Sequence, residues 1–90
     1  MRIAKRYLIS GRVQGVGFRF FTQVVAEREL IDGWVSNTSD GRVEVEAEGE
    51  AQAMMEFEDA IRKGPLGARV DQIEITPQTL SMNGTGFLIR

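Results

Sequence analysis

Histidine and cysteine are both absent from this sequence of 90 residues. Without these side chains there is no Ser-His or Cys-His nucleophilic pair, no imidazole acid or base, no disulfide framework and no usual zinc site. We therefore expect any catalysis by this chain to depend on positioning and electrostatic stabilisation.

Long apolar runs are also missing. No stretch approaches the ~20 consecutive apolar residues of a membrane-spanning helix, and the start of the chain, from Met1 to Arg6, lacks the apolar region of a signal peptide. Together with the absence of cysteine, this predicts a cytoplasmic protein with no membrane partner.

The sequence has no excess of basic residues, since 11 Lys or Arg stand against 13 Asp or Glu and the formal net charge is −2. Nucleic-acid-binding domains normally present a basic surface, so a nucleic-acid partner is not expected. The charge is unevenly distributed: residues 1–28 carry six Lys or Arg and one acid, whereas residues 29–90 carry five bases and twelve acids. Either the basic segment attracts a small anion, or solvated surface charges cluster there by chance.

The composition that remains is that of an ordinary globular protein, with 42% hydrophobic and 27% charged residues. Ninety residues can form one hydrophobic core without disulfide or metal support. We therefore predict a single domain over residues 1–90, and a monomer as the default state.

Glycine is concentrated in one stretch near the front, from Gly11 to Arg19 (GRVQGVGFR). A β-prone run precedes this stretch and an amphipathic run follows it, so it is typical of a strand, a glycine loop and the first turn of a helix. Glycines can adopt the positive φ angles that turn successive N–H groups into one concavity, and the helix start adds further donors. Phosphate is the natural occupant of such a site.

No Ser, Thr, Asp or Asn lies between Gly11 and Arg19 to cap the helix, which leaves its first N–H groups free for a ligand. The alternative is that Gly17 is itself a tolerated cap and the glycines only form a turn. The loop matches neither the Walker A motif nor the dinucleotide-binding fingerprint. The cation that it offers to an anion is Arg19.

Hydrophobic periodicity and turn residues predict the remaining elements. Asp40-Gly41 indicates a hairpin turn, and Pro77 is expected to end a strand. In that strand the apolar face switches between Val70 and Ile73, which predicts either a bulge or a late start of the strand. On the first helix, Arg19, Thr22 and Gln23 are expected to share a face away from the aromatic stripe. The predicted strands are 5–10, 34–37, 42–48, 69–76 and a short last one at 86–90, the predicted helices are 18–30 and 51–63, and 79–85 is predicted to be a polar loop.

The order β-α-β-β-α-β predicts an α+β fold, the ferredoxin-like α/β sandwich, with a four-stranded, mainly antiparallel sheet and two helices on one face. Strict alternation over residues 42–48 places Glu44, Glu46 and Glu48 on the open face of the sheet. RNA-binding sheets of this architecture display aromatic residues there, so the glutamates argue against that function.

These residues resemble a known family. Gly11 to Arg19 is similar to the first signature of acylphosphatases, and Gly33 to Val43 (GWVSNTSDGRV) is similar to the second. The resemblance continues to Phe87–Arg90 and so covers essentially the whole chain. Three positions depart from the family's pattern: Ser36 where a basic residue is frequent, Ile31 without the usual glycine, and Leu66 in place of a common proline.

The resemblance implies hydrolysis of the carboxyl-phosphate bond of a small acyl phosphate, with no metal and no organic cofactor. It implies two catalytic residues: Arg19, which holds the phosphate, and Asn37, which orients the attacking water. Thr22 is expected to support Asn37 or the loop. The implied substrate-binding groups are the backbone N–H groups of Gln14, Gly15, Val16, Gly17 and Phe18, together with that of Arg19.

The chemistry agrees with this implication, because a carboxylate leaving group has a solution pKa near 4 and departs at neutral pH without a general acid. Arg suits the clamp because its planar fork grips two oxygens at once. Other interpretations stay open: Asn37 also suits a turn, and the same loop could serve a non-catalytic phosphate sensor. The sequence identifies no group that reads the acyl tail.

Overall fold

The chain folds as one mixed sheet with two helices, and the computed structural model describes all residues 1–90. Every predicted element is present, and the helix at residues 51–63 has the predicted limits. The elements are β1 (Arg2–Arg12), α1 (Phe18–Arg28), β2 (Asp32–Asn37), β3 (Val43–Glu50), α2 (Ala51–Lys63), β4 (Arg69–Gln78) and β5 (Phe87–Ile89).

The sheet has the strand order β4-β1-β3-β2-β5. Its first four strands pair antiparallel, as the ferredoxin-like fold requires, whereas β5 pairs parallel with β2. The last short strand was predicted, but the predicted sheet had only four strands, so the observed sheet has one strand more than expected. A strand of three residues carries too little pattern to indicate a partner, and its place beside β2 depends on the long connection before it.

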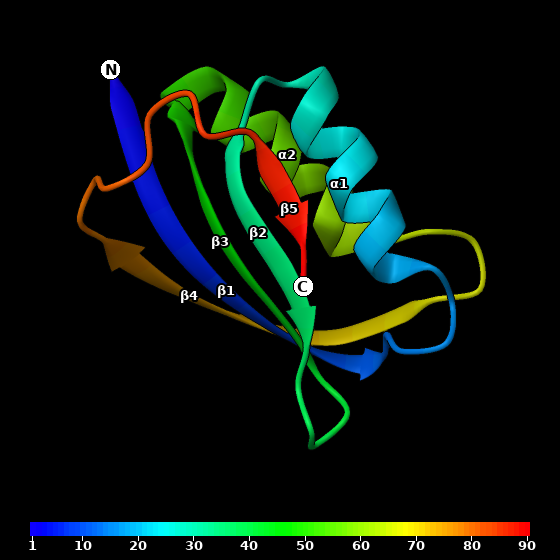
Figure 1. Cartoon of the computed structure of the whole chain (residues 1–90). Helices are drawn as coiled ribbons and strands as arrows, with labels where there is room; N and C mark the ends of the chain where they lie inside the picture. The colour runs from blue at the N-terminus through cyan, green and yellow to red at the C-terminus, as the bar shows by residue number, and fades with distance from the viewer.

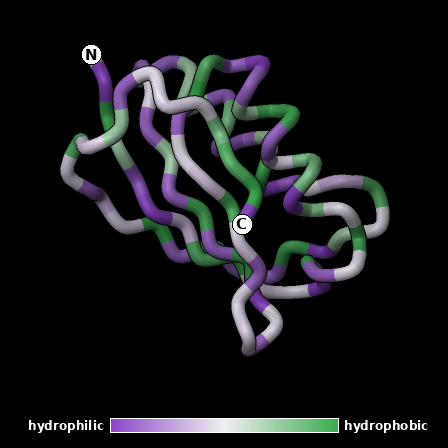
Figure 2. The backbone as a smooth tube through the Cα atoms, in the orientation of Figure 1, coloured by the Kyte–Doolittle hydropathy of each residue, from purple (hydrophilic) through white to green (hydrophobic).

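Both helices cover the same face of the sheet (Figure 1), because α1 connects β1 to β2 and α2 connects β3 to β4. Hydrophilic and hydrophobic residues alternate along the strands (Figure 2), so one face of the sheet packs against the helices. Neither helix has the length and apolar character needed to cross a membrane. The core between the layers consists of Tyr7, Ile9, Val13, Phe18, Val25, Ala26, Ile31, Val35, Val43, Val45, Ala47, Met54, Phe57, Ile61 and Phe87.

The edge strand β4 departs from the prediction at one end and agrees with it at the other. Pro77 does not end the strand but pairs opposite Lys5, because an edge strand can tolerate a residue without an N–H group. The expected bulge is confirmed, since the register shifts between Ser10, which lies opposite Gln72, and Gly11, which lies opposite Val70.

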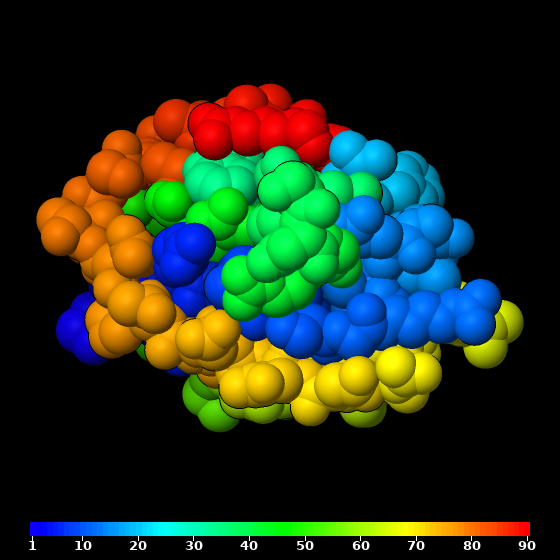
Figure 3. Space-filling model, turned by 90° about the horizontal axis from the view of Figure 1, so that it is seen from below, coloured from blue at the N-terminus to red at the C-terminus, as the bar shows by residue number.

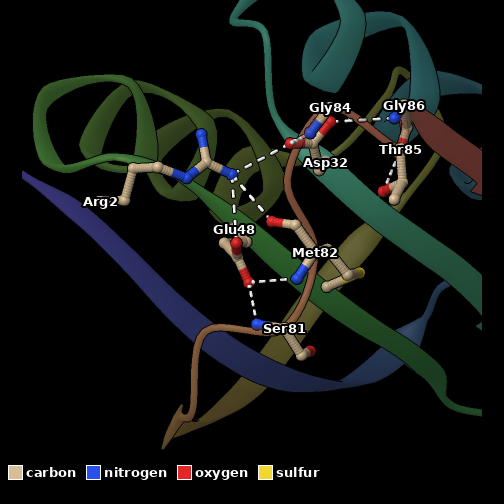
Figure 4. Close-up of polar contacts among 8 residues, drawn as sticks. All are labelled: Arg2, Asp32, Glu48, Ser81, Met82, Gly84, Thr85 and Gly86. Atoms are coloured by element: carbon tan, nitrogen blue, oxygen red, sulfur yellow. Dashed lines mark hydrogen bonds and ion pairs between the residues drawn. The ribbon is translucent and has the colours of Figure 1, made fainter.

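The alternation over residues 42–48 predicted that Glu48 lies on the open face of the sheet, and for this residue the prediction is wrong. Its side chain is only 2% exposed, and it accepts hydrogen bonds from the N–H groups of Ser81 and Met82 in the connection to β5. Arg2 pairs with Glu48 at 3.2 Å and with Asp32 at 3.0 Å, as Figure 4 shows. The polar connection thus covers one end of the sheet.

Burial alone would raise the pKa of each of these carboxyl groups. The N–H groups of Met82 and Ser81 and the Arg2 guanidinium outweigh burial at Glu48, so its pKa lies below the ordinary value. Asp32 accepts from Gly84 and Gly86, and together with Arg2 these bonds lower its pKa in the same way. Both carboxylates are therefore held in the charged form by the fold.

Candidate active site

The loop between β1 and α1 has the backbone alternation of an anion-binding nest. Gly15 has φ 74° and Gly17 has φ 79°, while the intervening Val16 does not have a positive φ. A Cβ atom at either glycine would meet no atom within 4 Å. Glycine is therefore required here by its backbone angle and not by crowding, and the space beside the loop is open.

The N–H groups of residues 14–19 donate no hydrogen bond within the chain. The helix has no side-chain cap, because its N-cap is Gly17, and its first hydrogen bond runs from the Phe21 N–H to the Gly17 carbonyl at 3.0 Å. Six successive donors at the positive end of the α1 dipole are thus free for a ligand.

The core holds both ends of this loop. Val13 and Phe18 are buried on either side of it, so the free donors lie on a fixed support. Thr22 is also fully buried, contrary to the expected outward face, and its hydroxyl donates to the Phe18 carbonyl at 2.8 Å. Its hydrogen bond is therefore to the first turn of α1 and not to Asn37.

Arg19 extends from the first turn of α1 into solvent. Its Nη1 donates to the backbone carbonyl of Arg90, just beyond β5, at 3.1 Å. A guanidinium carries five N–H donors, so this bond steadies the side chain and leaves most of its donors available.

Asn37 is the last residue of β2, immediately before the hairpin turn. The turn is closed by Thr38, whose N–H donates to the Arg42 carbonyl at 2.9 Å and whose hydroxyl accepts from the Arg42 N–H at 3.0 Å. Arg42 and Thr38 also bind Asp40 and lower its pKa to about 2. The Asn37 side-chain amide makes no hydrogen bond within the chain and lines a pocket beside the loop.

Gln14 joins the glycine loop to the hairpin. Its Nε2 donates to the carbonyls of Thr38 and Arg42, both at 2.9 Å. Figure 3 shows the hairpin turn, in green, against the loop, in blue. These two bonds fix the loop relative to the end of β2, and therefore relative to Asn37.

The glycine loop, the first turn of α1, the end of β2 and the end of β5 line a pocket of about 230 Å³ at the end of the sheet where β1 and β2 finish. The only ionisable side chain in its wall is that of Arg19. Gln14 and Val16, which the sequence also implicated, are not part of this wall. The wall consists of Val13, Gly15, Gly17, Phe18, Arg19, Phe20, Asn37 and Ile89.

Val13, Phe20 and Ile89 are the pocket residues that sequence analysis did not identify. Phe20 could have been identified from the sequence, because it lies outside the apolar face of its predicted helix. An aromatic residue at such a position is expected to be exposed, and here it stands next to Arg19. Nothing in the sequence indicated Ile89, since only the pairing of β5 with β2 brings it to the pocket.

Backbone donors, one cation and one unpaired amide meet at this pocket. Such an arrangement can hold the oxygens of a phosphoryl group and place a polar group beside them. No group of three or more Asp, Glu, His or Cys side chains is placed to hold a metal ion.

Three comparisons give the same result. The family model for acylphosphatase matches residues 5–89. An acylphosphatase of Koribacter versatilis is 44% identical over 94% of this chain and 77% of that protein, and one of Pseudomonas paraeruginosa is 44% identical over 99% and 97%. The crystal structure of acylphosphatase from Bacillus subtilis is similar with a TM-score of 0.93 and 39% identity, covering 98% of both chains.

The fold and the pocket define a class of small α+β protein in which free backbone donors lie beside a pocket at one end of a ferredoxin-like sheet. The comparisons with known proteins identify the family within this class. The chain belongs to the acylphosphatase family.

Proposed function

We propose that this protein hydrolyses small acyl phosphates, and that its active site is the pocket between the glycine loop and the hairpin. In this proposal the N–H groups of residues 14–19 and the Arg19 guanidinium bind the phosphoryl oxygens. The Asn37 amide orients a water molecule for in-line attack on phosphorus.

The proposed step balances without a cofactor. The water oxygen forms a bond to phosphorus, the bond between phosphorus and the acyl oxygen breaks, and the carboxylate leaves with the electron pair. No side chain in the wall can act as a general base, so the water proton passes to an oxygen of the phosphoryl group itself. The leaving carboxylate needs no proton at neutral pH.

One observation carries this proposal: the six successive N–H groups of residues 14–19 have no partner within the chain, and four of these residues, Gly15, Gly17, Phe18 and Arg19, line the same pocket as Asn37. A helix start that only formed a turn would normally satisfy some of these donors with a side-chain cap. Donors fixed before the reaction stabilise developing charge more strongly than mobile water does.

A phosphate-sensing module is the second candidate, because the same donors would bind inorganic phosphate without turnover. The unpaired Asn37 amide favours the enzyme, since phosphate binding by the nest alone does not need it. The test is to incubate the pure protein with benzoyl phosphate in the presence of EDTA. Rapid hydrolysis is expected, whereas phosphate binding without turnover would support the sensor.

We also propose that the protein acts as a monomer, because the free loop donors, Arg19 and Asn37 of a single chain already meet at the pocket and the proposed step needs no further group. Light scattering on the purified protein, at the concentration used for the assay, tests this. A cytoplasmic location stays a prediction from the sequence.

A further inference from the structure

Two exposed apolar side chains flank the candidate active site. Phe20 is 66% exposed and Ile89 is 41% exposed, and both line the same pocket as Arg19 and Asn37. Single exposed apolar residues are common on protein surfaces, but two that converge on one polar pocket suggest a binding role.

We propose that Phe20 and Ile89 form the subsite for the acyl group, so that this protein prefers acyl phosphates with an apolar, ring-sized acyl group. The inference rests on the proposed function and deepens it by naming the substrate class. It supplies the recognition of the acyl tail that the sequence did not reveal.

The wall of the pocket combines two kinds of side chain: Arg19 and Asn37 are polar, whereas Phe20 and Ile89 are exposed and apolar. Phe20 and Ile89 offer no side-chain hydrogen bond, so neither of them suits the phosphoryl oxygens, which the nest donors and Arg19 bind. An acyl group attached to that phosphoryl lies in or beside the same small pocket, and these two side chains are the exposed large apolar groups in its wall. Specific small-molecule sites commonly combine a few polar groups with an apolar wall in this way.

Both apolar residues lie on regular secondary structure, Phe20 on α1 and Ile89 on β5. Phe20 is in the first turn of α1, next to Arg19. The start of β5 is tied to α1 by Gln23, whose Nε2 donates to the Phe87 carbonyl at 3.2 Å. Just after β5, the Arg90 N–H donates to the Val35 carbonyl of β2 at 2.8 Å. Both apolar residues therefore lie on supported backbone, which lowers the entropic cost of binding.

The test compares kcat/KM for benzoyl phosphate with kcat/KM for acetyl phosphate. In the wild type we expect benzoyl phosphate to be the better substrate. In Phe20→Ala and Ile89→Ala the ratio of the two values should fall by about 10-fold, the usual effect of losing a few apolar contacts in a pocket. Phe20→Leu, which stays apolar, should recover most of the preference.

Matched controls come from the same elements. Val24→Ala removes an exposed apolar side chain from α1, one turn after Phe20, and Leu88→Ala removes one from β5, next to Ile89; neither residue lines the pocket. Both controls should keep the wild-type ratio. Inhibition by inorganic phosphate, measured in all variants, reports whether the phosphoryl end stays intact.

The outcomes separate the two proposals. If the wild type hydrolyses neither substrate, the proposed function fails and the subsite fails with it. If both substrates are hydrolysed but neither alanine variant changes the ratio, or if the controls change it equally, the subsite alone is wrong. A fall in the ratio confined to the pocket variants, with unchanged inhibition by phosphate, supports the subsite.

Discussion

Arg19 supplies the one full positive charge in the wall of the pocket, and the nest supplies partial charges. Replacement by Gln keeps a side chain of similar reach but removes the charge and the fork geometry. We predict that Arg19→Gln lowers kcat/KM for benzoyl phosphate by ~100- to 1,000-fold, the usual cost of losing a preorganised donor to a developing oxyanion. Steady-state kinetics on the folded variant measure this.

Arg28→Gln is the matched control, since Arg28 is an exposed residue near the other end of α1 whose Nε pairs with Glu29 at 3.3 Å. Its activity should equal that of the wild type. Turnover by Arg19→Gln within a few-fold of the wild type would show that Arg19 has no catalytic role.

Asn37 is predicted to act on the water and not on the phosphate. Asn37→Ala should therefore lower kcat by ~100-fold, as expected for a lost positioning contact, while inorganic phosphate still inhibits at nearly the wild-type concentration. Asn83→Ala, in the connection before β5, serves as the control. Collapse of phosphate inhibition with kcat retained would instead make Asn37 a phosphate ligand.

At the scale of elements, the site depends on the distance between the glycine loop and the hairpin. Gln14 holds this distance through two donated hydrogen bonds. We predict that Gln14→Leu lowers kcat by ~10- to 100-fold, because a shift of about 1 Å between reacting groups has effects of this size. Phosphate inhibition should change little, since the backbone donors remain.

Gln14→Glu sharpens this experiment, because an ionised carboxylate has the same shape but cannot donate. It should lose as much activity as Gln14→Leu. Gln52→Leu, a change on the exposed surface of α2, is the control. Full activity in both Gln14 variants would show that the loop and the hairpin need no side-chain link.

At the scale of the whole molecule, Asp32 and Glu48 tie β2 and β3 to the connection before β5. Their folded-state pKa values are depressed, so their contribution to stability is present above their unfolded-state pKa values and is lost as pH falls through the folded values. We predict a nearly constant Tm from pH 8 to about 6, and a steep decrease in Tm below about pH 4. Thermal melts across this range measure the effect.

Glu48→Gln tests the source of this dependence. The variant keeps the shape of the side chain but loses the charge that pairs with Arg2, so its Tm at pH 7 should fall by ~10 °C, the equivalent of about 2 kcal/mol for a domain of this size. Its Tm should approach that of the wild type as pH falls below 4. Glu56→Gln, on the exposed surface of α2, is the control and should leave Tm unchanged both at pH 7 and below pH 4. Parallel curves for Glu48→Gln and the wild type would contradict the linkage.

The sequence predicted local structure well where a period or a turn residue determined it. Apolar periodicity gave both helices and the four long strands, Asp40-Gly41 gave the hairpin, and the glycines at 15 and 17 gave the backbone angles of the loop. It was less accurate for Pro77 and Thr22, because an edge strand tolerates a missing donor and a buried hydroxyl can bond within its own helix.

Sequence by itself determined the elements, the order β-α-β-β-α-β and the free donors of an uncapped helix start, because these depend on neighbouring residues only. Tertiary structure alone decided that β5 joins the sheet, that Gln14 bridges the loop and the hairpin, that Glu48 is buried against the 79–86 connection, and that Ile89 meets Phe20 at the pocket. Each of these contacts joins residues far apart in the chain, and no local pattern records such a pairing.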